Sequence, residues 1–506
     1  MNLDALVGQL FMVDFSGPEP SAEVERLIVD GGVGGVTLFV KNVEGPGQVA
    51  RLTNALQSLA ADAGHPPLLV SVDQEGGPVV RLRGTWFPSA MAFGAATDET
   101  LAARAAEATA RELRATGIHL NFAPVLDVNS SPANPVIGVR SYGEDPARVA
   151  RLGVGAIAGM QSAGVLATAK HFPGHGDTVL DSHLALPMVS HGRDRLDAVE
   201  LLPFREAVQA GVSAVMTAHV VYAALDPEQP ATLSARIIAL LREEWGFGGL
   251  VVSDSMQMRA IADRLAPGDA AVQAVGAGVD IVLALGAVET QWEALHAVRA
   301  AARGGRIPAG RIQEAAERIL AAKRRLGLFD RPRVSEADAV RLAGCPAHLA
   351  LADRVAAAAA TLVAPRDGVV PLPPGPVYVA TGLASRETAD RLAGALRAAG
   401  RPVTTAAWEA RGSAQGAIVV PIGAGTREDP SWWDRVREVT RAASQQGPTV
   451  VVATDVPYPL AAVDPACACL AVYGADPPSL KAAAGVLAGT VPARGRLPVT
   501  VPLPAD

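Results

Sequence analysis

From the N-terminus to Phe329, short apolar runs alternate with longer segments whose apolar positions recur at helical spacing. Apolar runs bounded by Gly, Pro and polar residues are typical of buried strands, and the longer segments are typical of amphipathic helices. The pattern predicts helices between the strands, for example at Glu99–Thr116, Pro146–Ala163, Leu196–Ala210 and Glu289–Arg303. Strands that alternate with helices in this way indicate a parallel sheet. The predicted strands are Val33–Phe39, Leu68–Asp73, His119–Val128, Val165–His171, Ala214–Val220, Leu250–Ser255 and Val279–Leu285.

The number of repeating units favours a closed sheet. Roughly seven or eight strand–helix units within residues 1–330 match a (β/α)8 TIM-type barrel better than an open α/β sheet. In a barrel the carboxyl ends of the strands meet at one mouth, where active sites are built. We therefore expect the polar residues that end the predicted strands to converge there. These residues are Asp73, Asp127, Lys170–His171, His219 and Asp254.

A glycine-rich segment and the N-terminal segment are both assigned to ordinary secondary structure. The GGVGG sequence at Gly31–Gly35 precedes its strand, whereas a phosphate-binding glycine loop would follow a strand and open a helix. It is therefore predicted to be a helix stop and a turn. Residues Met1–Phe15 carry Asp4 and Asp14 in an amphipathic pattern and no basic region, so we expect a first helix and not a signal peptide.

A second domain is predicted after the barrel. A helix at Ala309–Leu326 is followed by Pro and charged residues, and residues 331–348 are predicted to be a linker. Residues 349–506 are predicted to form a smaller α/β domain of three layers, with helices at Glu387–Ala399 and Ser431–Ser444. The acidic residues Glu409, Glu428 and Asp429 are interpreted as solvated surface. Its predicted strands are Thr361–Ala364, Val377–Thr381, Ala417–Ile422, Thr449–Thr454 and Cys469–Tyr473.

Composition narrows the class of protein further. Of the 506 residues, 49% are hydrophobic and 19% charged, which is typical of an ordered globular chain. The net charge of −7 does not indicate a partner among nucleic acids or anionic membranes, and the apolar runs are too short or too interrupted to span a bilayer. Cys345, Cys467 and Cys469 form neither a disulfide framework nor a four-ligand metal site. We expect a cytoplasmic protein without cofactor or metal; the sequence does not indicate its oligomeric state.

The residues from Lys170 to His183 read KHFPGHGDTVLDSH and follow an apolar, strand-like run. A lysine, three histidines and two aspartates lie here among Pro173, Gly174 and Gly176, which keep the segment irregular. Such a loop after a strand is typical of a catalytic site. The same glycines and proline disfavour a helical zinc-binding HxxxH arrangement of His171, His175 and His183 with Asp177 and Asp181, which is the first alternative.

Six motifs in order give a more specific indication. They are VDQEGGPVVRL at Val72–Leu82, IGVRSYGEDP at Ile137–Pro146, AKHFPGHGDT at Ala169–Thr178, DSH at Asp181–His183, MTAHV at Met216–Val220 and VVSDSMQM at Val251–Met258. Together they resemble family 3 of the glycoside hydrolases, in particular its two-domain β-N-acetylglucosaminidase branch. The resemblance implies a retaining enzyme that releases terminal N-acetylglucosamine from cell-wall muropeptide fragments, as in peptidoglycan recycling.

The resemblance also implies roles for single residues. It makes Asp254 the nucleophile, which agrees with the cost of burying an aspartate at a strand end without a function. Asp181 and His183 would be an acid/base dyad, because imidazole titrates near pH 6.5 and a carboxylate can fix its tautomer. We expect a turn at these two residues. By motif position, the residues that bind the saccharide substrate are Asp73, Arg81, Arg140, Lys170 and His171.

The chain departs from the family pattern at one position, and three alternatives stay open. The family commonly reads DQEGGR where this chain has Pro78, which removes a charge and an N–H at the rim of the site. A β-glucosidase or β-xylosidase of the same family is an alternative, although such enzymes lack the GHGDT and DSH loop. A non-enzymatic sugar-binding relative would lack Asp254 or His183. An N-acetylglucosaminide phosphorylase is also possible, because a neutral histidine does not repel phosphate.

Overall fold

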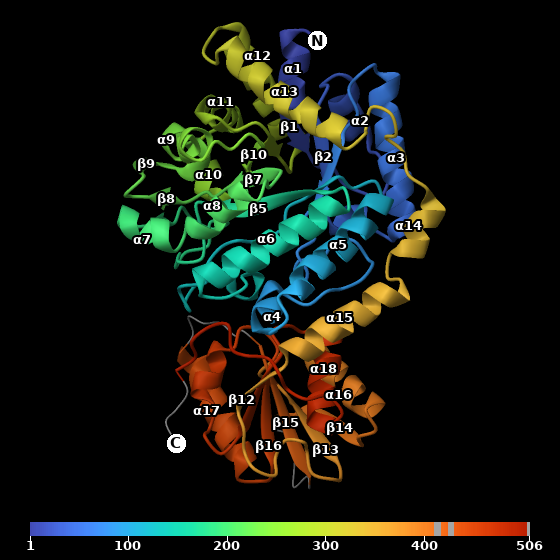
Figure 1. Cartoon of the computed structure of the whole chain (residues 1–506), viewed down its shortest axis with the longest axis vertical. Coiled ribbons are helices and arrows are strands. Elements are labelled where there is room, and N and C mark those ends of the chain that lie inside the picture. The colour runs from blue at the N-terminus through green and yellow to red at the C-terminus, as the bar shows by residue number, and fades with distance from the viewer. Residues whose placement is uncertain (409–415, 424–429, 503–506) are drawn as a thin grey trace.

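The computed structural model describes residues 1–408, 416–423 and 430–502, and Figure 1 shows two α/β bodies, one above the other. Within residues 1–330, eight parallel strands form one sheet in the order β10-β7-β5-β4-β3-β2-β1-β11. A parallel bridge from Val252 to Ile281 joins its two edges, so the sheet closes and the predicted barrel is confirmed. The strands are β1 Phe11–Val13, β2 Gly35–Leu38, β3 Leu69–Val72, β4 Leu120–Asn121, β5 Leu166–Phe172, β7 Ala214–Thr217, β10 Leu250–Ser253 and β11 Val282–Ala284.

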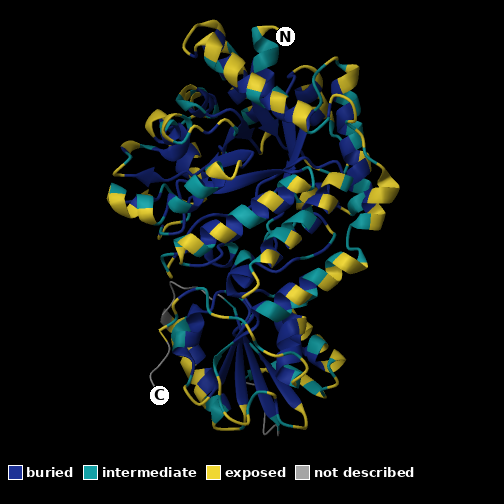
Figure 2. Cartoon of the chain, in the orientation of Figure 1, coloured by how far each residue is buried: buried dark blue, intermediate teal, exposed yellow. Residues whose placement is uncertain are grey.

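Helices surround the barrel and bury its strands. Every residue of β2, β3, β7 and β10 is buried, as expected for parallel strands covered on both faces (Figure 2). The helices of this region are α1 Leu3–Gln9, α2 Ala22–Val29, α3 Pro46–Asp62, α4 Ala90–Ala95, α5 Thr100–Ala115, α6 Pro146–Ser162, α7 Arg193–Ala198, α8 Leu202–Gln209, α9 Ala235–Ala239, α10 Arg259–Ala262, α11 Pro267–Ala277, α12 Val288–Arg303 and α13 Ala309–Arg325.

The structure corrects two predicted helices. The first ends at Gln9, and strand β1 follows at Phe11–Val13, within the segment expected to be one helix. The predicted helix Leu196–Ala210 is two helices, because Pro203 lies in the first turn of α8 and lacks the N–H that a continuous helix would need. The GGVGG segment is the predicted turn between α2 and β2, and a Cβ on Gly34 would lie 2.0 Å from the Gln9 carbonyl oxygen.

The C-terminal region contains, in its described part, a six-stranded sheet in the order β12-β17-β16-β15-β13-β14. Alternate strand residues face opposite sides, so Val377 and Val379 pack with α16 and α18 while Tyr378 and Ala380 pack with α17. The predicted three-layer domain is therefore confirmed; Glu409, Glu428 and Asp429 lie outside the described residues. Its elements are β12 Thr361–Ala364, β13 Val377–Thr381, α16 Arg386–Ala398, β14 Val403–Ala407, β15 Ala417–Ile422, α17 Pro430–Ser444, β16 Thr449–Ala453, β17 Ala468–Ala471 and α18 Pro477–Ala488.

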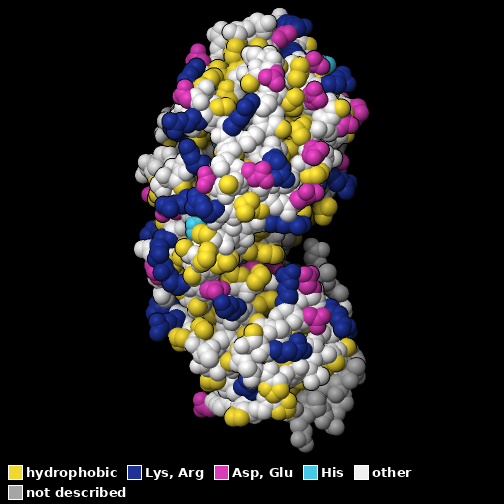
Figure 3. Space-filling view, turned by 90° about the vertical axis from the view of Figure 1, so that its right-hand side faces the viewer, with side chains coloured by type: hydrophobic (Ala, Val, Ile, Leu, Met, Phe, Trp, Pro, Cys, Tyr) yellow, Lys and Arg dark blue, Asp and Glu magenta, His cyan; other side chains and the backbone are white. Residues whose placement is uncertain are grey.

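Helices α14 (Glu336–Leu342) and α15 (Pro346–Ala359) connect the two bodies along the chain. Helix α14 falls inside the predicted linker and contacts α3 and α5 of the barrel, so this segment lies against the barrel surface. The domain boundaries themselves stay a prediction. On the face shown in Figure 3, basic and acidic side chains are interspersed. None of the helices in the described ranges has the length and apolar composition needed to cross a membrane.

Candidate active site

The carboxyl ends of the barrel strands surround a cavity of about 540 Å³. Asp73 directly follows β3, Lys170 and His171 lie in β5, and Asp254 directly follows β10. The pairing register between β5 and β7 shifts between Ala169 and Phe172, and at this irregularity both Lys170 and His171 reach the cavity. All predicted site residues except Asp181 line it: Asp73, Arg81, Arg140, Lys170, His171, His183 and Asp254.

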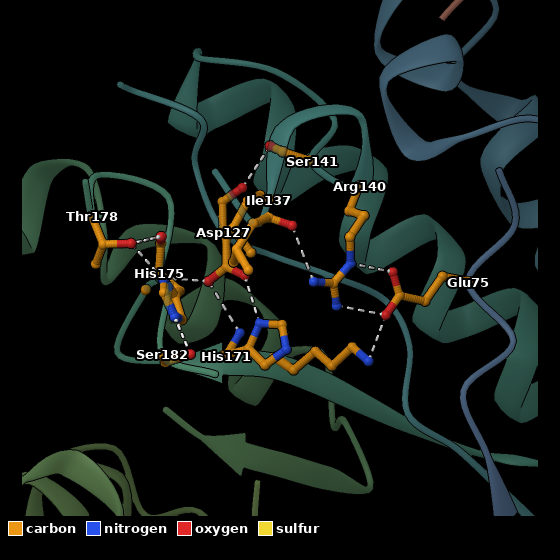
Figure 4. Close-up of polar contacts among 12 residues, drawn as sticks. Glu75, Asp127, Ile137, Arg140, Ser141, His171, His175, Thr178 and Ser182 are labelled. Carbon is orange, nitrogen blue, oxygen red and sulfur yellow. Dashed lines mark hydrogen bonds and ion pairs between the residues drawn. The ribbon is translucent and has the colours of Figure 1, made fainter. Parts of the chain in front are cut away.

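Four charged side chains form a continuous chain along one wall. The Lys170 ammonium lies 2.7 Å from Asp73 Oδ1 and 2.6 Å from Glu75 Oε1. Arg140 donates two hydrogen bonds of 2.8 Å to the two oxygens of Glu75 (Figure 4). Burial opposes the charged form of Glu75, but Arg140 and Lys170 outweigh it and hold the pKa of this carboxyl well below its ordinary value. Glu75, Arg140 and Lys170 are therefore ionised at neutral pH.

Glu75 is a site residue that the sequence interpretation missed. It lies in the motif that supplied Asp73 and Arg81, but nothing in the sequence pairs it with Arg140 and Lys170. Burial lowers the pKa of Lys170, yet Asp73 and Glu75 together raise it above its ordinary value. The side chain of Lys170 is only 2% exposed, so it is a fixed positive charge beneath the cavity.

His171 is held by Asp127, which was predicted only as a polar strand end. Its Nδ1 lies 2.7 Å from Asp127 Oδ2, and its backbone N–H donates to Oδ1 at 3.1 Å. The backbone N–H of His175 donates to the same Oδ1 at 2.6 Å. Burial raises the pKa of Asp127, but His171 and His175 outweigh it and the net shift is downward. An ionised Asp127 therefore fixes the orientation of His171 and the start of the following loop.

His175 lies within that loop and contacts two of its hydroxyl groups. Its Nδ1 lies 2.7 Å from the Thr178 hydroxyl and its Nε2 lies 2.8 Å from the Ser182 hydroxyl (Figure 4). Burial lowers the pKa of His175 to about 4, so its ring is neutral at pH 7. In the described part of the chain, no group of three or more His, Cys, Asp or Glu side chains is placed to hold a metal ion.

Asp254 presents a carboxylate to the cavity. It is not the N-cap of the next helix, because α10 begins at Arg259 with Met258 as N-cap. Its Oδ1 accepts a 2.7 Å hydrogen bond from the Ser255 N–H. Burial raises the pKa of Asp254, but His171, His219, this N–H and Lys170 outweigh it, so the pKa lies below its ordinary value. The carboxylate is thus charged and available as a nucleophile.

His183 and Asp181 lie in a turn, as expected from the sequence. Asp181 Oδ1 lies 2.7 Å from His183 Nδ1 and accepts the backbone N–H of His183 at 2.8 Å. The His183 side chain is 60% exposed, whereas that of Asp181 is 24% exposed. The imidazole can therefore exchange protons with solvent while the carboxylate sets its tautomer.

Side-chain and strand contacts join the two ends of the loop that carries His183. Asp177, near its start, pairs with His191, near its end, and also accepts a 2.9 Å hydrogen bond from the Ser130 hydroxyl. A short strand, β6 Met188–Val189, pairs with β8 Val221–Tyr222 beside β9 Asp226–Pro230. The segment that presents His183 is therefore fixed at both ends.

The rim that carries Arg81 accommodates Pro78. Pro78 is exposed within a turn that the Gly76–Val79 bridge closes, and Val79 and Arg81 are the residues that reach the cavity. The backbone N–H of Arg81 donates to Gln74 Oε1 at 2.8 Å. The buried Nε of Arg81 has no hydrogen-bond partner among the described residues.

A closed (β/α)8 barrel with a charged cavity at the carboxyl ends of its strands defines the protein as a barrel enzyme. Residues 2–322 match the glycosyl hydrolase family 3 N terminal domain. The chain therefore belongs to family 3 of the glycoside hydrolases, and the family expected from its motifs is confirmed.

Individual relatives extend this similarity beyond the barrel. β-Hexosaminidase A of Pseudoalteromonas piscicida is 38% identical over 409 residues, covering 72% of this chain and 68% of that protein. A β-hexosaminidase of Alkalilimnicola ehrlichii is 41% identical over 287 residues, covering 55% of this chain and 80% of that protein. A family 3 β-N-acetylglucosaminidase structure from Paenibacillus sp. str. FPU-7 superposes over 100% of both chains, with a TM-score of 0.92 and 39% identity. The similarity thus includes the second domain.

Proposed function

We propose that this protein is a retaining exo-β-N-acetylglucosaminidase that removes terminal, non-reducing N-acetylglucosamine. The observation that carries the proposal is one cavity lined by both an ionised carboxylate, Asp254, and a solvent-accessible imidazole, His183, that a second carboxylate orients. These are the two functions that retaining hydrolysis needs, a nucleophile and an acid/base group. The named relatives and the Paenibacillus structure support the sugar.

The proposed reaction has two steps. Asp254 attacks the anomeric carbon and forms a glycosyl ester while the bond to the leaving oxygen breaks. His183, held by Asp181 through Nδ1, donates its Nε2 proton to that oxygen. In the second step His183 takes a proton from water through Nε2, and the resulting hydroxide displaces Asp254 from the anomeric carbon. Two displacements restore the original configuration.

The charged wall supplies recognition in this proposal. Asp73 accepts hydrogen bonds from ring hydroxyls, while His171, Arg140 and the partly unpaired Arg81 donate or share them. Lys170 holds Asp73 in place through its ion pair, and Glu75 holds Arg140 in the same way. A fixed set of charged partners favours a small, hydroxyl-rich ring over an apolar ligand.

We further propose that the natural substrates are small cell-wall muropeptide fragments processed in the cytoplasm. The support is the resemblance of the motifs to the branch of the family that acts in peptidoglycan recycling. Comparison of catalytic efficiency on disaccharide fragments and on intact wall tests this part. A preference for intact wall would contradict it.

One experiment tests the reaction itself. Nitrophenyl N-acetylglucosaminide, glucoside and N-acetylgalactosaminide are compared, with and without phosphate, and the configuration of the first product is read by NMR. The expected result is a β-configured N-acetylglucosamine that does not depend on phosphate. Inverted product would contradict the mechanism, a preference for glucoside would contradict the substrate, and a sugar phosphate would identify a phosphorylase. A 2-fluoro sugar should label Asp254 and no other residue.

A further inference from the structure

The C-terminal domain shares an apolar core with the mouth of the barrel. Met91, Ala92 and Ala95 of helix α4 are buried in the same cluster as residues of the six-stranded sheet and α17. Val139 belongs to this cluster as well, and it is the residue directly before Arg140. The short 3₁₀ turn Gly138–Arg140 therefore places one side chain in the core between the domains and the next in the sugar cavity.

Two tyrosines of the C-terminal domain make polar contacts across this interface. Asn129 of the barrel donates a 2.7 Å hydrogen bond from its side-chain nitrogen to the Tyr458 hydroxyl, and Asn129 is fully buried. The Ser89 hydroxyl donates to the Tyr473 carbonyl at 2.7 Å. Because these groups are shielded from water, each bond constrains the position of the barrel segment that it holds.

Asn129 is connected to the cavity by short steps. It lies two residues after Asp127, the carboxylate that orients His171. Its backbone N–H donates to the Gly143 carbonyl at 2.9 Å. The Ser141 hydroxyl donates to the Asp127 carbonyl at 2.6 Å (Figure 4). The same hydroxyl lies 3.0 Å from the Gly143 carbonyl, to which it also donates. The segment after β4 that holds His171 through Asp127, and the turn that contains Arg140, are thus one hydrogen-bonded unit, with Asn129 at its outer edge.

The segment around Pro498 and Thr500, near the C-terminus, also contacts the unit of Asp127, Ser141 and Gly143. The Glu144 N–H donates to the Pro498 carbonyl at 3.1 Å, and Thr500 donates its N–H to the Glu144 carboxylate at 2.8 Å. Gly143 adopts a φ of +144°, and a Cβ there would lie 2.5 Å from the Pro498 carbonyl oxygen. This close approach requires glycine.

We propose that the C-terminal domain acts on sugar binding, with Tyr458 as a positioning residue. Through Asn129 it holds the unit of Asp127, Ser141 and Gly143, and so sets the positions of His171 and Arg140. Tyr458 touches neither the sugar nor the reacting atoms. The proposal rests on the proposed function only in the choice of substrate. The proposal gives the second domain a role in sugar recognition. His183 and Asp254 take no part in the series of contacts from Tyr458 to His171 and Arg140.

The test compares Tyr458→Phe with Tyr378→Phe. Tyr378 lies in the same domain, but its hydroxyl donates to the carbonyl oxygens of Ala406 and Ala407. Loss of the Tyr458 hydroxyl should raise both KM and the inhibition constant for free N-acetylglucosamine roughly threefold to tenfold, the range for one hydrogen bond, with kcat nearly unchanged. Tyr378→Phe should match the wild type. Equal KM values for the two variants, or a loss confined to kcat, would overturn the proposal.

A double-mutant cycle with Asn129→Ala tests the path. If Tyr458 acts through Asn129, the double variant should bind no more weakly than the worse single variant. Effects that multiply would contradict this path. Thr500→Val removes the hydroxyl that donates to the Glu144 carboxylate at 2.5 Å. It should also raise KM and provides an independent variant. If the wild type does not cleave N-acetylglucosaminides, the proposed function fails alone, and the same comparison is made with the glycoside that it does cleave.

Discussion

At the scale of single residues, the cavity depends on alternating buried charges. Asp73, Lys170, Glu75 and Arg140 neutralise one another, so none is left uncompensated at low solvent exposure. A buried pair of this kind costs little while complete, but removal of one member leaves its partner charged and unpaired. Glu75 is the critical member because it contacts two cations.

Glu75→Gln should therefore lower kcat/KM on the order of a hundredfold, since Arg140 and Lys170 would then face each other without a full counter-charge. Steady-state kinetics and a thermal unfolding curve measure the two effects. Glu112→Gln is the matched control, because Glu112 is also buried and pairs with His348 at 2.7 Å. It should reduce stability more than activity. Similar losses of activity in both variants would show that Glu75 has no special role.

The dependence of the hydrolysis rate on the leaving group tests whether His183 is the general acid. His183→Ala should slow hydrolysis of poor leaving groups by about 10²–10⁴-fold, the usual range for general acid catalysis. Activated aryl glycosides should be much less affected, because their leaving groups need no proton. His296→Ala, an exposed histidine on α12, is the control. Equal losses on both substrate classes would show that another group is the acid.

The sequence largely predicted which residues line the cavity, but it did not predict which of them contact one another. Asp73, Arg81, Arg140, Lys170, His171, His183 and Asp254 were expected from the motifs, and all of them line one cavity. Asp127 was predicted as a polar residue at a strand end, and Glu75 lies two residues after the predicted Asp73. The role of Glu75 depends on its contact with Arg140, 65 positions further along the chain. The role of Asp127 depends on its contact with His171, 44 positions further along. Such pairs come from strand order, which local pattern does not contain.

At the scale of elements, pattern predicted long segments well and short ones poorly. Helices α5, α6, α12 and α13 agree with their predictions to within one residue at each end, as repeated helical periodicity allows. Strand β1 has three residues and no measurable period, so it was absorbed into the first helix. The break at Pro203 was overlooked because the apolar spacing continues across it.

The loop that presents His183 gives a prediction at this scale. His191→Ala removes the pair with Asp177 that joins the two ends of the loop. Because the pair is partly exposed, the expected loss of kcat on poor leaving groups is only roughly twofold to fivefold. KM should not change, since the sugar-binding wall lies on other elements. Kinetics on matched substrates with good and poor leaving groups measure this. A change in KM alone would contradict the role of the pair.

At the scale of the whole molecule, two α/β bodies in this order were predictable, but their mutual contact was not. The sequence contains no signal that Tyr458 meets Asn129, 329 positions away. The interface joins two separately patterned regions through a few side chains. For the same reason, the role of the second domain could not be predicted before the fold was known.

A buried lysine makes the stability of the whole fold depend on pH. Lys323 on α13 is 0% exposed, and its ammonium donates to Gln9 Oε1 at 2.6 Å. Burial lowers its pKa from 10.5 to about 7. Between these two values the unfolded chain binds a proton that the folded chain has lost. The free energy of unfolding should therefore rise with pH across this window, by at most about 1.4 kcal/mol per pH unit.

Lys323→Met should remove this dependence. Urea unfolding between pH 7 and 10 should show the wild type gaining stability relative to the variant as pH rises. Lys481→Met is the control, because that lysine is 71% exposed and pairs with Asp353 on the surface. Its curve should run parallel to the wild type. If the Lys323→Met curve also ran parallel to the wild type, Lys323 would have to remain protonated in the folded protein, with Gln9 and its surroundings compensating the buried charge.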